Sequence, residues 1–273
     1  MRFCRPWVGY NYFRHTSRFI RKLIVLALKQ EISTKQTESL SFKPVDFALY
    51  SFHYQPIYCL NTGDLIMYES LLRASPEVSQ SIESLIVDII SGGQEDALTV
   101  FTLESVAKYL LEPRFSSVSF TINLEPAQIA SDNFFKFITE FFSDNGLNKN
   151  RVIFEITERP CSALILNKMI DVVNVLNSFG FSFALDDFGT GISNFDLLSV
   201  LDVKLIKFDR SFCKKALSHK NSHNVLVLAS SFKSNFECSV CLEGLETAEQ
   251  INLAKRLGFC YGQGYGLGRP APL

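Results

Sequence analysis

The chain has 273 residues, of which 47% are hydrophobic and 25 are phenylalanine, enough apolar side chains for one large α/β domain or two small ones. The net charge of −1 conceals an uneven distribution, because residues 1–30 carry seven basic residues and no acidic one, whereas the remainder holds 20 basic and 28 acidic residues. The seven cysteines are odd in number and scattered, which argues against a disulfide-stapled scaffold and is typical of reduced thiols in a cytoplasmic protein.

Residues 1–45 are predicted to be a basic arm and linker that precede the body of the chain at 46–273. The best candidate for a membrane span has an uninterrupted apolar run of only six residues, Leu23 to Leu28, whereas a span needs roughly 20. No small-residue cleavage site follows it, so we expect neither a transmembrane helix nor a secretory signal. The basic charge leaves open a contact with an anionic membrane surface or a protein, beside a docking helix or a poorly ordered extension.

From residue 46 onward, β-rich apolar runs alternate with longer helical segments. Strands are predicted at 52–59, 65–72, 117–124, 151–157, 181–186, 204–209, 238–244 and 262–267. Helical segments are predicted at 81–90, 97–112, 132–146, 163–180, 221–232 and 247–258. This alternation favours a mostly parallel sheet with helices outside it.

The first two strands are joined by only "LNTGD", residues 60–64. Five residues cannot make a parallel crossover, so these strands are predicted to form an antiparallel hairpin. We therefore expect an α/β fold, a modified (β/α)8 barrel with one antiparallel strand near the start. An open doubly wound sheet is the alternative, although no G-x-G-x-x-G fingerprint follows the first strand.

Polar residues stand at or near the carboxyl end of nearly every predicted strand. They are Glu69, Asn123, Glu155, Asp186, Asp187, Lys207, Asp209, Glu243, Glu246 and Gln263. The carboxyl ends of barrel strands meet on the face where active sites are built. Unpaired buried charge is costly, so we expect these side chains to act together. Taken singly, each also fits a plainer role: Asp187 in a turn, or Glu246 as a helix cap.

The residue types at these strand ends indicate metal chemistry. Alternation along a strand places Lys207 and Asp209 on one face, and it places Asp186 in the barrel mouth with Asp187 at the rim. Carboxylates with one amide oxygen form a hard, all-oxygen ligand set that prefers Mg²⁺ or Mn²⁺ to zinc. A metal pair can activate water against a phosphodiester. Lys207 is suited to stabilise the developing charge, and Arg73 to bind a phosphate bidentately.

These motifs together resemble the EAL-domain family of cyclic di-GMP phosphodiesterases. The matching segments are "FHYQPIY", "YESLLR", "INLEP", "FEITE", "ALDDFGTGISNFDLL", "IKFDRSF", "EGLETAEQ" and "GFCYGQGYGLGRP", which cover roughly residues 48–272 in the family's order. The resemblance implies a modified βα barrel that hydrolyses cyclic di-GMP to linear pGpG with two Mg²⁺ or Mn²⁺ ions. We expect no nucleic-acid polymer as a partner.

The resemblance also implies roles for individual residues. The implied metal ligands are Glu69, Asn123, Glu155, Asp186 and Asp187, with Glu243 as a further ligand or the general base. Lys207 is implied to orient the attacking water, with Asp209 and Glu246 as supporting acids. Arg73 and Gln263 are implied substrate contacts, Gln55 lies at the family's position near a guanine base, and Glu158 resembles the glutamate that anchors the loop after Asp187. That loop, 188–195, is the family's link between homodimerisation and activity.

Three departures from the family pattern leave every implied ligand in place. The signature triplet at 69–71 is Glu-Ser-Leu instead of Glu-Ala-Leu, Ile192 replaces a usual Tyr, and Leu242 replaces a usual Ala. The leading interpretation is an active phosphodiesterase. The alternatives are a non-catalytic EAL-type module that binds cyclic di-GMP or a protein, and an unrelated Mg²⁺-dependent barrel enzyme acting on enolates.

Overall fold

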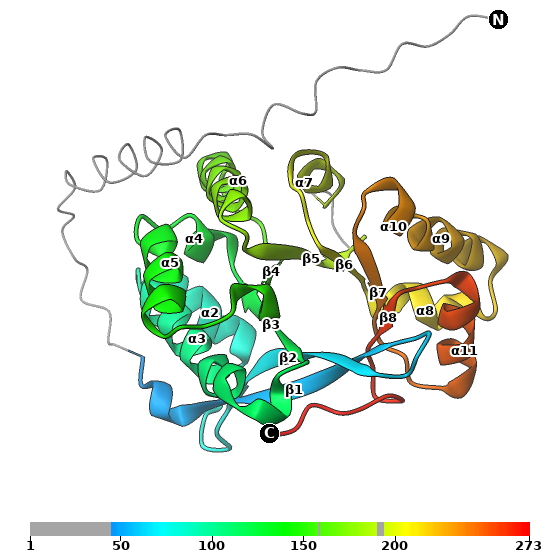
Figure 1. The fold of residues 1–273 in the computed structure, drawn as a ribbon, viewed down its shortest axis with the longest axis horizontal. Coiled ribbons are helices and arrows are strands. Elements are labelled where there is room, and N and C mark those ends of the chain that lie inside the picture. The colour runs from blue at the N-terminus through cyan, green and yellow to red at the C-terminus, as the bar shows by residue number, and fades with distance from the viewer. Residues whose placement is uncertain (1–44, 158, 190–193) are drawn as a thin grey trace, which may run out of the picture. The chain divides into compact units, whose positions relative to one another are not determined.

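The computed structural model describes residues 45–157, 159–189 and 194–273, and within them eight strands form a closed barrel in the ring order β1 to β8 (Figure 1). The strands are β1 (Tyr50–Cys59), β2 (Leu65–Ala74), β3 (Ser119–Leu124), β4 (Val152–Ile156), β5 (Ser182–Phe188), β6 (Leu205–Phe208), β7 (Ser239–Leu242) and β8 (Tyr261–Gly262). Closure of the ring confirms the predicted barrel and excludes the open sheet.

Strand β1 is the reversed strand of the barrel. It pairs antiparallel with β2 on one side and with β8 on the other, while the remaining neighbours from β2 to β8 are parallel. The β1–β2 pairing places Gln55 opposite Glu69. The predicted hairpin is therefore confirmed, and its short turn explains why only this connection lacks a helix.

Helices follow the other strands and lie outside the barrel (Figure 1). They are α2 (Ile82–Ser91), α3 (Glu95–Leu111), α4 (Pro126–Ile129), α5 (Phe134–Asp144), α6 (Ala163–Ser178), α7 (Asn194–Val200), α8 (Arg210–Ala216), α9 (Lys220–Ser230), α10 (Phe232–Asn235) and α11 (Ala248–Leu257). Their starts follow local chemistry, because Ser81, Ser162 and Thr247 accept backbone N–H bonds as N-caps. The short helices α4, α7, α8 and α10 were not predicted as separate elements.

Apolar residues on the two faces of the strands form two distinct cores. The outward side chains of Phe120, Phe154 and Phe183 are fully buried beneath the helices. The inward side chains of one layer form a small cluster inside the barrel: Ile57, Met67, Ala184, Leu205 and Cys241. Two residues farther along the parallel strands, and two residues earlier on the reversed strand β1, the same face carries polar side chains. This polar layer is the candidate site.

Strand β8 is much shorter than predicted. It comprises only Tyr261–Gly262, because the chain turns back against the loop after β7 instead of extending to residue 267. The Leu245 amide donates to the Gln263 carbonyl at 3.0 Å, and the Gly266 amide donates to the Leu245 carbonyl at 2.8 Å. A Cβ at Gly264 would lie 2.2 Å from the Leu245 nitrogen, so only glycine permits this approach.

None of the described helices is both long enough and apolar enough to cross a membrane. Residues 1–44 of the predicted basic arm lie outside the described residues. The arm, its contacts and the boundary at residue 45 therefore stay predictions.

Candidate active site

The polar layer inside the barrel arises from side-chain alternation along all eight strands, with its last two members directly after β7 and β8. Lys207 lies two residues beyond Leu205, Asp186 two beyond Ala184, and Glu243 two beyond Cys241. Residues two apart on a strand face the same side, so each of these three polar groups shares a face with an apolar residue of the interior cluster. The layer contains Gln55, Glu69, Asn123, Glu155, Asp186, Lys207, Glu243 and Gln263, and the structure thus brings eight of the predicted site residues together.

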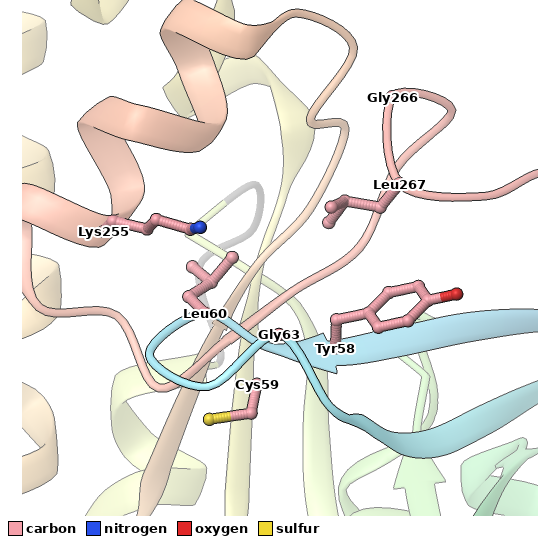
Figure 2. A pocket seen from close by; sticks show the side chains of 7 residues that line it. All are labelled: Tyr58, Cys59, Leu60, Gly63, Lys255, Gly266 and Leu267. Atoms are coloured by element: carbon pink, nitrogen blue, oxygen red, sulfur yellow. The ribbon is translucent and has the colours of Figure 1, made fainter.

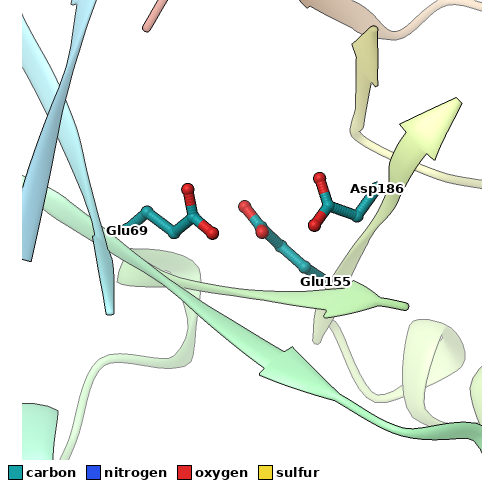
Figure 3. Close-up of side chains that lie close together, drawn as sticks. All are labelled: Glu69, Glu155 and Asp186. Carbon is teal, nitrogen blue, oxygen red and sulfur yellow. The ribbon is translucent and has the colours of Figure 1, made fainter. Parts of the chain in front are cut away.

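Lys207 lies at the centre of this layer. Its Nζ atom is 3.1 Å from Glu69 Oε2, 2.9 Å from Glu155 Oε2, 3.0 Å from Asp186 Oδ1 and 2.8 Å from Glu243 Oε1. The lysine side chain is 1% exposed and that of Glu155 is fully buried. One buried ammonium therefore contacts four carboxylates, three on separate strands and one directly after β7. Figure 3 shows the carboxylates of Glu69, Glu155 and Asp186 converging from β2, β4 and β5.

Burial and mutual repulsion govern protonation in this layer. Burial would lower the pKa of Lys207, but the four carboxylates around it outweigh that effect and hold the pKa well above its usual value. Burial raises the pKa of Glu155 and Asp186, and raises that of Glu243 to about 8, against the opposing effect of Lys207. Glu69 differs, because Lys207 and donated hydrogen bonds outweigh its burial and lower its pKa. The layer therefore holds more acid than one ammonium can neutralise.

A bulge at the end of β5 lets two adjacent aspartates serve one site. The pairing with β6 advances three residues on β5, from Leu185 to Phe188, against two on β6. Asp187 takes a left-handed conformation, with φ of 48°, which is uncommon for a residue other than glycine. A bulge of this kind re-aims side chains, and the Asp187 carboxylate consequently lies near those of Asp186 and Glu243.

Asp187 lies at the rim, as predicted, and is exposed where Asp186 is partly buried. Desolvation, followed by the charges of Asp186 and Asp209, raises the pKa of Asp187 to about 6. The Asp209 carboxylate accepts a hydrogen bond from the Ser211 amide at 2.8 Å at the start of α8. Asp209 therefore acts on the acid cluster through its charge, outside the set that contacts Lys207.

The carboxylates fall into two groups that fit divalent cations. Ligand oxygens of Glu69, Glu155 and Asp186 lie within 4.8 Å of one another, and so do those of Asp186, Asp187 and Glu243. Glu155 Oε1 is buried and has no hydrogen-bond partner among the described residues, a costly state for a carboxylate oxygen. Asp186 belongs to both groups. An all-oxygen donor set with an unpartnered buried oxygen fits hard cations such as Mg²⁺ or Mn²⁺.

Amide side chains orient Glu69. Asn123 Nδ2 donates to Glu69 Oε1 at 3.0 Å, and Gln263 Nε2 donates to Glu69 Oε2 at 2.5 Å. Gln263 also donates to Gln55 Oε1 at 3.2 Å, while Gln55 donates to the Gly268 carbonyl at 3.0 Å. This network connects Gln55 on β1 and Gly268 after β8 to Glu69, one of the predicted metal ligands.

The remaining predicted residues lie outside the group that contacts Lys207. Arg73 Nη1 donates to the carbonyl of its neighbour Leu72 at 2.8 Å. Glu246 is exposed, and the N-cap of α11 is Thr247 rather than Glu246. Glu158 and most of the predicted dimer loop, residues 190–193, lie outside the described residues. The roles of these residues stay predictions.

The serine in the signature triplet has a specific environment. Ser70 points away from the barrel interior, is 2% exposed, and its hydroxyl lies 3.4 Å from that of Ser105 on α3. Ser105 donates onward to the Thr102 carbonyl at 2.6 Å. A small polar residue is therefore accommodated behind Glu69 without altering the carboxylate itself.

Two charged residues near the site went unnoticed in the sequence. Glu125 follows Asn123 by two positions and is 5% exposed, and Arg159 lies four positions after Glu155, with its Nε atom 2.8 Å from Glu125 Oε2. The signal was present, since both motifs place an ionisable residue just beyond a predicted ligand. Only the tertiary structure brings the two together.

A pocket of about 240 Å³ lies elsewhere and includes none of the predicted site residues (Figure 2). It is formed by the β1–β2 hairpin, the end of α11 and the segment after β8, and is lined by Tyr58, Cys59, Leu60, Gly63, Lys255, Gly266 and Leu267. The carboxylate layer is thus distinct from this cavity.

Two named relatives align with most of this chain. The cyclic di-GMP phosphodiesterase TpdA of Vibrio parahaemolyticus is 28% identical over 259 residues, which are 94% of this chain and 44% of that protein. The probable cyclic di-GMP phosphodiesterase PdeA of Escherichia coli is 33% identical over 178 residues, 63% of this chain and 24% of that protein. The chain spans less than half the length of either relative.

Solved structures share the fold. A PaMucR phosphodiesterase in complex with c-di-GMP superposes with a TM-score of 0.73 at 23% identity, covering 82% of this chain and 93% of that one. An EAL domain protein from Listeria monocytogenes gives the same TM-score and identity, covering 82% and 89%. The EAL domain family model matches residues 48–270. The matched range, together with this barrel and its acid layer, shows that the chain belongs to the EAL domain family.

Proposed function

We propose that this chain hydrolyses cyclic di-GMP to linear pGpG with the help of two Mg²⁺ or Mn²⁺ ions. The observation that carries the proposal is the buried layer in which Lys207 contacts four carboxylates on or directly after separate strands. Relatives named as cyclic di-GMP phosphodiesterases, and a structural neighbour solved with c-di-GMP, support the same substrate.

Formal charge supports two divalent ions. Glu69, Glu155, Asp186, Asp187 and Glu243 as carboxylates, with the Lys207 ammonium, carry a formal charge of −4 in one layer. Two divalent cations would neutralise that charge. We assign these five acids and the Asn123 amide oxygen as the residues that hold the ions. When bound, such ions supply a polarised water and a counter-charge for the phosphodiester.

The chain's own groups supply position and proton transfer. In the overall reaction the oxygen of water bonds to phosphorus, the bond from phosphorus to the 3′ oxygen breaks, and a proton passes to that oxygen. Lys207 holds its ammonium against four acids, a position from which it orients the attacking water and stabilises negative charge on phosphate. Glu243, at the mouth and 18% exposed, is our assignment for a further ligand or the general base. Arg73, Gln55 and Gln263 are assigned to the substrate, and Asp209 and Glu246 to supporting roles.

We also propose a homodimer that forms through the region of residues 188–195. In support, Phe195 and Val200 on α7 are 61% and 50% exposed, and Phe236 at the end of α10 is 41% exposed. Phe195 and Phe236 both contact the ring of Phe232, so the exposed apolar side chains are neighbours. Sedimentation of a Phe195→Asp variant tests this: a monomer supports the proposal, and an unchanged dimer contradicts it.

Turnover by the purified chain tests the enzymatic proposal. Cyclic di-GMP is incubated with Mg²⁺ or Mn²⁺, and products are separated by liquid chromatography. We expect pGpG from the wild type and from a control variant, Glu112→Ala, whose side chain is 38% exposed in a surface ion pair. We expect none from Glu69→Ala. Binding of cyclic di-GMP without turnover would instead indicate a non-catalytic module. The absence of both binding and turnover would refute cyclic di-GMP as the substrate.

A further inference from the structure

The ends of β3 and β4 are joined beyond their last paired residues. Strand pairing ends with Leu124 opposite Ile156, one residue after Asn123 opposite Glu155. The Thr157 amide then donates to the Leu124 carbonyl at 3.1 Å, and its hydroxyl does so at 3.3 Å. Two of the assigned metal ligands therefore lie on strands whose ends are tied together immediately above them.

Glu125 is anchored at this junction by a chain of buried hydrogen bonds. Its amide donates to Gln128 Oε1 at 3.0 Å, and Gln128 Nε2 donates to Thr99 Oγ1 on α3 at 3.0 Å. Gln128 and Thr99 are 2% and 1% exposed. The carboxylate of Glu125 is thus presented from a buried network that leads back to the second long helix.

Arg159 neutralises this buried carboxylate from the other loop. Its Nε atom lies 2.8 Å from Glu125 Oε2, and the two side chains are 33% and 6% exposed. A buried acid without its partner is strongly unfavourable, so the loop after β4 is driven to stay against the end of β3.

We propose that Glu125 and Arg159 form a clasp that positions Asn123 and Glu155 for the divalent ions. Neither clasp residue is a ligand; both act through the strand ends that they join. The inference rests on the proposed function, because it takes the ions of that function as the groups being positioned. Residues that orient metal ligands typically contribute 10-fold to 100-fold to metal affinity.

Mn²⁺ binding to the full chain, measured by titration calorimetry without substrate, tests the clasp. We expect Glu125→Gln and Arg159→Ala each to raise the Mn²⁺ dissociation constant about 10-fold or more. Because the two residues act as one unit, the double variant should lose little beyond either single variant. Arg159→Lys keeps the charge and should recover part of the affinity.

An ion pair of the same atoms elsewhere supplies the matched control. Arg114 Nε lies 2.6 Å from Glu112 Oε2, on side chains 61% and 38% exposed, and Arg114→Ala should leave Mn²⁺ binding unchanged. Thermal denaturation of every variant separates positioning from stability, since a purely structural pair would lower the melting temperature of Arg159→Lys or the double variant without changing Mn²⁺ affinity. That result would overturn the clasp.

The clasp and the proposed function fail in different ways. A wild type that binds Mn²⁺ but does not hydrolyse cyclic di-GMP refutes the function, while the variants still decide the clasp. Variants that bind Mn²⁺ as the wild type does refute the clasp, whatever the turnover. A wild type that binds no Mn²⁺ refutes both, because there is then no ion to position.

Discussion

Replacement of Lys207 by methionine tests the electrostatic account of the acid layer most directly. Methionine keeps much of the aliphatic volume but removes the ammonium that lies 2.8–3.1 Å from four carboxylates. The lysine is 1% exposed, and removal of one partner from a buried ion pair costs about 3–5 kcal/mol. We expect Lys207→Met to lose about this much free energy of unfolding at pH 8 in the absence of divalent ions. With Mg²⁺ or Mn²⁺ supplied, we expect it to show no turnover.

The loss should depend on pH, because protonation can relieve the uncompensated acids. The pKa of Glu243 is raised to about 8 and that of Asp187 to about 6, so the folded state binds more protons than the unfolded chain. Their contribution to stability is fully present below the usual carboxyl pKa and is lost as pH rises through the raised values. The metal-free wild type should therefore become less stable between about pH 4 and pH 8, and Lys207→Met should fall more steeply.

Urea denaturation followed by circular dichroism in EDTA measures these free energies at pH 5 and pH 8. The matched control is Lys168→Met, which removes a lysine from an ion pair with Asp132 whose side chains are 42% and 65% exposed. Exposed pairs contribute at most about 1 kcal/mol, so this variant should differ little from the wild type at either pH. Equal stability of Lys207→Met and the wild type at pH 8 would refute the reasoning.

Three further predictions concern the surroundings of the site. Gly189→Ala should lower the free energy of unfolding by about 2–4 kcal/mol in urea denaturation, because φ there is +96° and the new Cβ would lie 2.4 Å from the Phe212 ring. Full recovery of stability in Gly189→Ala/Phe212→Ala would contradict the contribution that we assign to backbone strain. Ser70→Ala should change the free energy of unfolding by less than about 1 kcal/mol and leave turnover within twofold, because its contact with Ser105 is 3.4 Å long. A large loss of turnover with stability retained would give the triplet serine a catalytic role. Cys241 should resist iodoacetamide at pH 8 until the chain unfolds, because burial raises its thiol pKa well above the usual value; rapid labelling of the native protein, read by mass spectrometry, would show that the barrel interior opens.

Local sequence patterns were sufficient for the order and type of most elements. Alternating strands and helices, and a turn too short for a crossover, predicted the barrel and its reversed strand β1. The predicted extent of β8 was wrong, because the alternation of glycine with Gln263, Tyr265 and Leu267 is compatible with a strand but does not require one. Their path is set by backbone contacts with Leu245 instead, and such contacts between distant segments leave no local pattern.

The sequence by itself predicted most members of the polar layer, since polar groups after apolar strands marked the acids, the lysine, Asn123 and Gln263. Tertiary structure alone decided their geometry. Lys207 meets Glu69, Glu155, Asp186 and Glu243 only because the ring of strands closes, and Asp186 and Asp187 serve one site only because a bulge interrupts their alternation. The physical reason is that strand periodicity fixes the face on which a side chain lies, whereas distances between faces depend on register, closure and bulges that arise from pairing between remote parts of the chain.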